Sequence, residues 1–149
     1  MDPYHLDRFR KAHLEQYDEA LEEIRCGQKR THWMWFVFPQ PEGLGRSPTA
    51  QYYAIRSPEE AKAYLSDEYL GGHLREICGA LVLLETDDPE QVFGYTDALK
   101  LRSCMTLFNC ISEGEGLFGR ILNKYYGGEP DPAVLDWIET PKRQKPSEH

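Results

Sequence analysis

The sequence predicts an all-α fold, a single compact domain of about eight short-to-medium helices. Helix-start signals recur along the chain, the longer segments repeat apolar residues at helical spacing, and nothing alternates strands with helices. A chain of 149 residues can bury one sizeable core, so we expect a single helical domain over residues 1–140. The basic, proline-containing segment 141–149 is expected to be a disordered tail.

The first expected helix covers residues 3–26. Its predicted core face is an apolar series at helical spacing, and Gly27 follows in position to end the helix: Leu6, Phe9, Leu14, Tyr17, Leu21 and Ile24. The opposite face is charged, as on a helix that packs one side against a core.

An aromatic run follows at residues 32–40, with the sequence His-Trp-Met-Trp-Phe-Val-Phe-Pro-Gln. It holds two of the three tryptophans and two of the six phenylalanines. Periodicity does not assign residues 33–38 to helix or strand; their residue types weakly favour a strand, and Pro39 ends either.

Beyond this run, four sites place a capping side chain directly before a proline suited to the first helical position: Ser47-Pro48, Ser57-Pro58, Asp88-Pro89 and Asp131-Pro132. Apolar spacing also predicts helices over residues 72–85, 96–111 and 116–126. Gly127-Gly128 ends the last of these, and a short helix carrying Trp137 follows from Ala133 to Thr140.

Composition excludes several classes of protein. A net charge of −8 argues against general nucleic-acid binding. No apolar run approaches the ~20 residues that cross a bilayer, and the start lacks a secretory signal, so we expect a cytoplasmic protein. Four irregularly spaced cysteines predict reduced thiols, and the five histidines have no metal-ligand spacing, so neither metal nor other cofactor is expected.

The charges are unevenly distributed. Glu42 is the only acidic residue among residues 24–58, where even spreading would place about six, and the same window contains five cations. Residues 98–112 also lack acids and contain Lys100 and Arg102. The distribution indicates a local anion-binding surface, or aromatic core segments that simply exclude carboxylates.

The loop Gly43-Leu44-Gly45-Arg46-Ser47 leads into a helix start, where backbone N–H groups and Arg46 could hold an anion. Neither common glycine-rich nucleotide motif is present, and a plain connecting loop explains the glycines equally well. Upstream, Lys29 and Arg30 are candidate anion ligands, His32 a candidate general base, and Trp33 and Trp35 candidate stacking platforms, with Gln40 at the end of the run. Core packing is the simpler role for these aromatic residues and for His32.

A second constellation spans residues 93–108. Lys100, Arg102 and Ser103 are candidate ligand-binding residues, and Asp97 is a candidate orienter or general base. Asp97 and Lys100 could instead pair with each other across one helical turn. Cys104 has no neighbouring histidine to activate a thiol.

Together these motifs resemble the family called domain of unknown function 1810, whose members are sometimes labelled calpastatin-like. The resemblance spans nearly the whole chain and rests on Phe9, Tyr17, Gly27, Lys29, Arg30, His32 to Gln40, Gly43-Leu44-Gly45, Ser47, Tyr53-Ala54-Ile55, Glu60-Ala61, Tyr64-Leu65, Leu70-Gly71, Leu74, Phe93-Gly94, Asp97, Lys100-Leu101, Ser103, Thr106-Leu107-Phe108, Gly128 and Asp131. His13, His73 and Cys104 depart from the usual glutamine, arginine and serine. The resemblance implies a soluble, all-helical protein, α-horseshoe-like or irregularly orthogonal, with a helical aromatic run and no established activity.

Three functional hypotheses follow. In the first, the two constellations form one pocket for a small anionic ligand, such as a nucleotide or an ADP-ribose-like molecule, with hydrolysis or group transfer as a fitting chemistry. In the second, the aromatic and basic segment is a protein-interaction module that binds an acidic partner segment without catalysis. In the third, the signature is a folding requirement, with tryptophans buried and cations paired.

Overall fold

The computed structural model describes residues 2–140, and these residues confirm the all-α fold. The predicted tail at 141–149 lies outside the described residues. Eight helices follow one another in the described part: α1 (Asp7–Arg25), α2 (Met34–Val37), α3 (Pro48–Tyr52), α4 (Pro58–Ser66), α5 (Glu68–Leu83), α6 (Pro89–Ile111), α7 (Leu117–Tyr126) and α8 (Pro132–Glu139).

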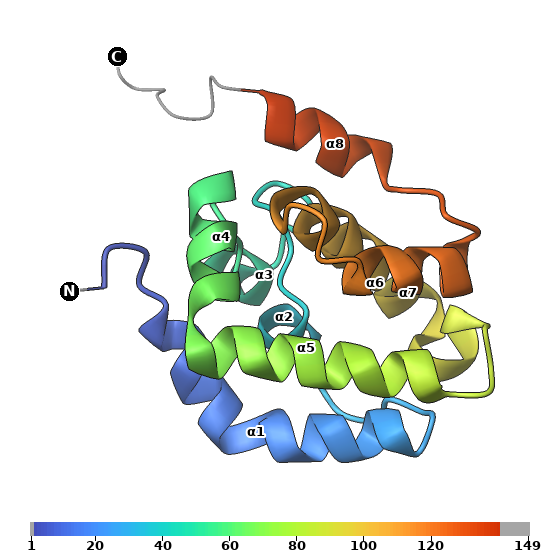
Figure 1. Cartoon of the computed structure of the whole chain (residues 1–149). Coiled ribbons are helices and arrows are strands. Elements are labelled where there is room, and N and C mark those ends of the chain that lie inside the picture. Colours follow the sequence, from blue (N-terminus) through green and yellow to red (C-terminus); the bar gives the residue numbers. More distant parts are fainter. Residues whose placement is uncertain (1, 141–149) are drawn as a thin grey trace.

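Some of the helices lie side by side, and others cross. Figure 1 shows α1 and α5 side by side, α4 rising from the start of α5, and α8 at the top of the view, where it packs against α6. Helices α6 and α7 pack together and close the core from the other side.

All four predicted capping residues cap their helices. The side chains of Ser47 and Ser57 each accept a hydrogen bond from a backbone N–H at 3.1 Å, and those of Asp88 and Asp131 do so at 3.0 Å. Each cap satisfies a backbone donor that the first helical turn leaves free. These short side chains therefore set where α3, α4, α6 and α8 begin.

The weak strand preference for residues 33–38 is wrong. Met34–Val37 form the single helical turn α2, in which the Val37 and Phe38 amides donate to the Trp33 and Met34 carbonyls at 3.1 and 3.0 Å. Within the described residues, the one β-type pairing is an isolated bridge between Pro41 and Ile55. With no neighbouring strand, the run satisfies its backbone locally as a helix.

Two details of the long helices also differ from the sequence expectation. Leu14, placed on the core face of α1, is 76% exposed, and the neighbouring His13 is buried instead. Helix α6 begins at Pro89 and kinks at Gly94, whose φ of 81° lies in a region that other residues rarely adopt. The segment predicted over 96–111 is the part of α6 beyond this kink.

The buried residues form one contiguous hydrophobic cluster drawn from seven of the eight helices. A buried ion pair between Arg8 and Glu60, at 2.7 Å, also joins α1 to α4. Within residues 2–140, no helix is long and apolar enough to cross a membrane.

Candidate functional site

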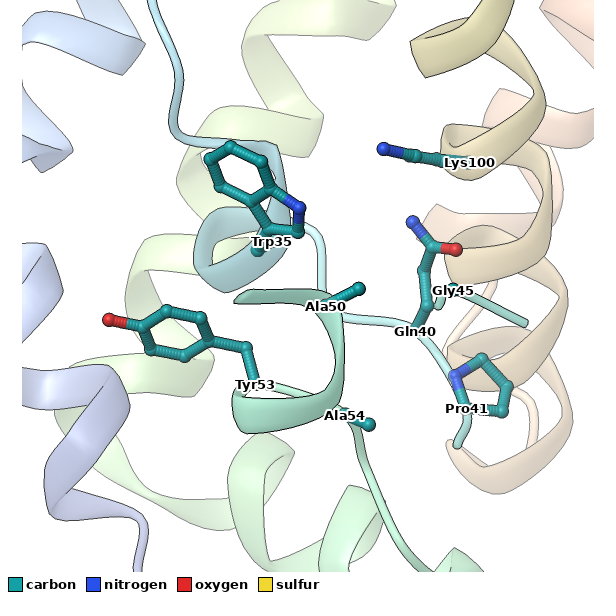
Figure 2. Close-up of a pocket in the computed structure, with 8 residues that line it drawn as sticks. All are labelled: Trp35, Gln40, Pro41, Gly45, Ala50, Tyr53, Ala54 and Lys100. Carbon is teal, nitrogen blue, oxygen red and sulfur yellow. The ribbon is translucent and has the colours of Figure 1, made fainter. Parts of the chain in front are cut away.

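The segments 29–47 and 93–106 meet at one concave surface. At its centre is a narrow pocket between α2, α3 and α6, and Figure 2 shows the side chains that surround it. Its lining residues come from both predicted constellations and from α3 and the turn after it: Trp35, Gln40, Pro41, Gly45, Ala50, Tyr53, Ala54 and Lys100. We call this the central pocket.

Two wider depressions continue the central pocket on either side. One, of about 350 Å³, shares Gly45 and Ala54 with it and adds Arg46 and Arg56. The other, of about 270 Å³, shares Gln40 and Lys100 and is bordered by Leu44, Thr96, Leu99, Ser103 and Asp131. Because each depression shares lining residues with the narrow pocket, which has a volume of about 30 Å³, the three hollows adjoin one another.

Three hydrogen-bond donors converge on the central pocket. In Figure 2 the indole nitrogen of Trp35, the side-chain amide of Gln40 and the ammonium group of Lys100 face the same space from different elements. Lys100 Nζ lies 5.9 Å from the centre of the Trp35 ring. Among the described residues, neither the Trp35 indole N–H nor the Gln40 amide has a hydrogen-bond partner, so both are free for a ligand.

Asp97 connects the pocket to the core. Its carboxylate lies 2.9 Å from Lys29 Nζ and 3.6 Å from Lys100 Nζ. The mostly buried Lys29 ammonium also donates to the Thr31 carbonyl at 2.6 Å and lies 5.0 Å from the centre of the Trp33 ring. Lys29 thus fixes Asp97, and Asp97 holds Lys100 at the pocket.

Trp33 belongs to the core rather than to the pocket. Its side chain is fully buried and its indole N–H donates to Glu23 at 2.8 Å. Glu23 also accepts from the Arg30 and Thr31 amides and from the Thr31 hydroxyl. Burial alone would raise the pKa of Glu23, but these hydrogen bonds outweigh it and lower the pKa.

The glycine loop has a structural explanation in most of its residues. Ser47 caps α3, and a Cβ on Gly45 would lie 2.6 Å from the Ala50 Cβ, so the loop passes too close to α3 for a larger residue. Gly43 has a φ of 95°. Arg46 differs from these residues because its guanidinium is exposed and has no partner in the described part of the chain.

The remaining predicted site residues lie around the pocket or away from it. Arg102 donates to the Glu129 and Pro130 carbonyls, and the Ser103 hydroxyl donates to Asp131 at 2.6 Å, so both residues hold the start of α8. His32 is exposed, and its ring centre lies 6.4 Å from that of Trp35. Arg30 is also exposed, and it does not line the central pocket.

Sequence reasoning missed four lining residues: Pro41, Ala50, Tyr53 and Ala54. Tyr53 packs against Phe36, with ring centres 5.2 Å apart, and burial raises its pKa. None of the four carries a chemical signal in the sequence. Tyr53 and Ala54 do fall within the family-like pattern, which was the available clue.

The fold and the site define a small all-α protein whose donor-lined pocket is built by α2, α3 and α6. A family model described as protein of unknown function (DUF1810) matches residues 3–138, so the chain belongs to this family. It is also similar to the crystal structure of the conserved hypothetical protein Rv1873 from Mycobacterium tuberculosis, at 45% identity and a TM-score of 0.91 over 93% of this chain and 99% of that one. A comparison with curated proteins gives no match.

Proposed function

We propose that the protein binds a small anionic ligand with a planar ring, nucleotide-like or ADP-ribose-like, along the central pocket and its two depressions. The observation that carries the proposal is the convergence of the Trp35, Gln40 and Lys100 donors, two of which have no protein partner in the described residues. Unpaired donors around a hollow favour a ligand that supplies acceptors.

The arrangement also narrows the set of residues that would touch this ligand. Lys29 is mostly buried and bonds Asp97 at 2.9 Å, and Arg102 bonds backbone carbonyls. Lys100 lies farther from Asp97, at 3.6 Å, Arg56 lies 4.0 Å from Glu42, and Arg46 has no partner among the described residues, so these three cations are the candidates for phosphate oxygens. The half-exposed face of Trp35 is the stacking platform. An elongated ligand would lay its ring at Trp35 and extend its anionic part toward Arg46.

The proposal also assigns a role in catalysis. His32, whose ring centre lies 6.4 Å from that of Trp35, is the candidate proton-transfer group, and Asp97 serves to position Lys100, since both its oxygens face lysines. Hydrolysis or transfer at a glycosidic or phosphoester bond would then use His32.

A nucleotide and ADP-ribose panel tests the proposal by thermal shift and by quenching of tryptophan fluorescence. We expect a ligand that raises the melting temperature of the wild type, and Lys100→Met and Trp35→Phe to weaken its binding at least tenfold. Lys11→Met is the matched control, because Lys11 is exposed and distant in the chain from the pocket. No shift at millimolar ligand, or equal binding by Lys100→Met, would refute the proposal.

One observation favours the second candidate function, an interaction module. Leu44 and Leu99 are 38% and 47% exposed beside Lys100, so an acidic partner segment could bury both while pairing with the lysine. Leu99→Ser discriminates the two functions. It should abolish partner binding, whereas a small ligand that lies between Trp35 and Arg46, away from the depression that Leu99 borders, should still bind.

A further inference from the structure

A second hollow, separate from the central pocket, lies along α5 between the end of α1 and the start of α7. It has a volume of about 460 Å³ and shares no lining residue with the central pocket or with either of its depressions. Figure 1 shows α5 lying between α1 and α7, the three helices that supply most of the lining residues. We call it the α5 groove; its lining is Arg25, Glu76, Gly79, Ala80, Val82, Leu83, Leu84, Leu117 and Arg120.

The floor of the α5 groove is apolar and open. Leu83 is 84% exposed, more than any other large apolar side chain among the described residues. Val82, Leu84 and Leu117 line the same groove and are only half-buried. Apolar side chains gathered in one hollow, rather than scattered singly, indicate a surface that a partner covers.

Gly79 keeps the groove deep. It lies inside α5, where glycine is less stable than alanine, and an added Cβ would meet no atom within 4 Å. Packing therefore does not require a glycine at this position. A larger side chain would project into the hollow that Glu76, Gly79 and Leu83 line at helical spacing.

The charged groups of the groove favour an acidic partner. Arg25 and Arg120 come from α1 and α7, and neither guanidinium group has an ion pair or hydrogen bond in the described part of the chain. Arg120 lies in the first turns of α7, where the helix dipole disfavours a cation, so its own helix does not explain it. Glu76, the one carboxylate in the lining, already accepts from the Tyr17 hydroxyl at 2.7 Å.

We propose that the α5 groove is a docking site for an amphipathic helical segment of a partner protein. Its leucine-type side chains would cover Leu83 and its neighbours, and its flanking carboxylates would pair with Arg25 and Arg120. An apolar floor between two free guanidinium groups matches an apolar face edged by acids. The described residues offer no unpaired strand edge, so the helix-in-groove mode fits this surface.

A displayed library of amphipathic helical peptides, selected on the wild-type protein, tests the proposal. Enriched peptides should carry Asp or Glu beside Leu, Ile or Phe, and should bind Gly79→Leu and the pair Arg25→Glu with Arg120→Glu at least tenfold more weakly. The control is Gly72→Leu, because Gly72 also lies in α5 with nothing within 4 Å of an added Cβ but is outside the groove lining. Circular dichroism melting checks that each variant is folded. If Gly79→Leu does not fold, the variant with both Arg25→Glu and Arg120→Glu still tests the proposal.

Three outcomes would overturn the proposal. The first is that no enriched peptide distinguishes Gly79→Leu from Gly72→Leu. The second is that the enriched peptides are basic or lack acids. The third is a wild-type protein that dimerises in analytical ultracentrifugation and loses the dimer in Gly79→Leu alone, which would make a second copy the occupant.

Discussion

Trp33 and Trp35 are two residues apart, yet they lie in opposite chemical surroundings. The Trp33 indole N–H donates to a buried carboxylate that accepts four hydrogen bonds, whereas the Trp35 indole N–H faces the central pocket and has no hydrogen-bond partner among the described residues. Each ring also has its own lysine, and the two lysines share Asp97. The single turn of α2 therefore lies between two sets of polar groups. Those around Trp33 bond one another and stabilise the fold, whereas the Trp35 and Gln40 donors have no partner among the described residues.

This contrast gives a physical criterion for telling core from site within one aromatic run. A buried donor without an acceptor is unfavourable, so evolution of a stable core pairs every such group, as it does at Trp33. Unpaired donors beside Trp35 have no stabilising role in the fold. If this criterion is right, substitutions around Trp33 should reduce stability, and substitutions around Trp35 should reduce ligand binding.

The largest effect on stability is expected at Glu23. Glu23→Ala removes the acceptor for the Arg30 and Thr31 amides and for the Trp33 indole, and should lower the free energy of unfolding by about 3 kcal/mol or more. Urea denaturation measures this. Glu19→Ala, an exposed residue of the same helix, should change stability by less than about 0.5 kcal/mol; a similar loss in both variants would contradict the core network.

The two tryptophans should respond unequally to the same substitution. Trp33→Phe leaves a cavity in a packed core and deprives Glu23 of a donor, at a cost of roughly 2 kcal/mol. Trp35→Phe removes no protein hydrogen bond and should cost less than about 0.5 kcal/mol. Equal losses in denaturant titrations would remove the distinction between the two sides of α2.

The free energy of unfolding should depend on pH through His13, which contacts the backbone of the aromatic run. His13 Nε2 lies 2.8 Å from the Phe36 carbonyl, which only accepts, so this nitrogen carries hydrogen and the neutral Nδ1 accepts from His73 at 2.9 Å. Burial lowers the pKa of His13 to about 4, against 6.5 in an unfolded chain. The stability from this ring is complete above pH 6.5 and is lost as the pH falls toward 4.

Between pH 6.5 and 5 the unfolding free energy should therefore fall by up to about 1.4 kcal/mol per pH unit from His13. Burial also lowers the pKa of His73, which adds to the same trend. Most carboxylates titrate below this window, so the histidines dominate it. His13→Gln should flatten the slope measured by denaturation at several pH values, and an unchanged slope would place the effect elsewhere.

Most of the helical fold could be predicted from the sequence because local signals determine it. The side chains of Ser57 and Asp88 need only a nearby backbone N–H to cap a helix. The proline that follows each of them has a φ suited to the first helical position. The core face of α1 contains His13 rather than the expected Leu14. His13 bonds His73 and the Phe36 carbonyl, both of which are distant in the chain. No local pattern contains such a pairing.

The candidate site was predicted only in outline for the same reason. Charge distribution located its two segments, but it treated Lys29, Arg102 and Lys100 alike. Their difference arises from acceptors that folding brings close: Asp97 and Thr31 for Lys29, and the Glu129 and Pro130 carbonyls for Arg102. Which cations remain free is a property of the tertiary structure.

The smallest effect on stability should come from Lys100, and its contrast with Lys29 is informative because both lysines face one carboxylate. Lys100→Met breaks a half-exposed pair at 3.6 Å and should change the unfolding free energy by less than about 0.5 kcal/mol. Lys29→Met removes a mostly buried ammonium that bonds Asp97 and the Thr31 carbonyl, and should cost about 1.5 kcal/mol or more. If Lys100→Met also loses the ligand while Lys29→Met keeps part of it, the two lysines divide binding from folding. If Lys100 proves as important for stability as Lys29, the donors beside Trp35 are part of the core network after all.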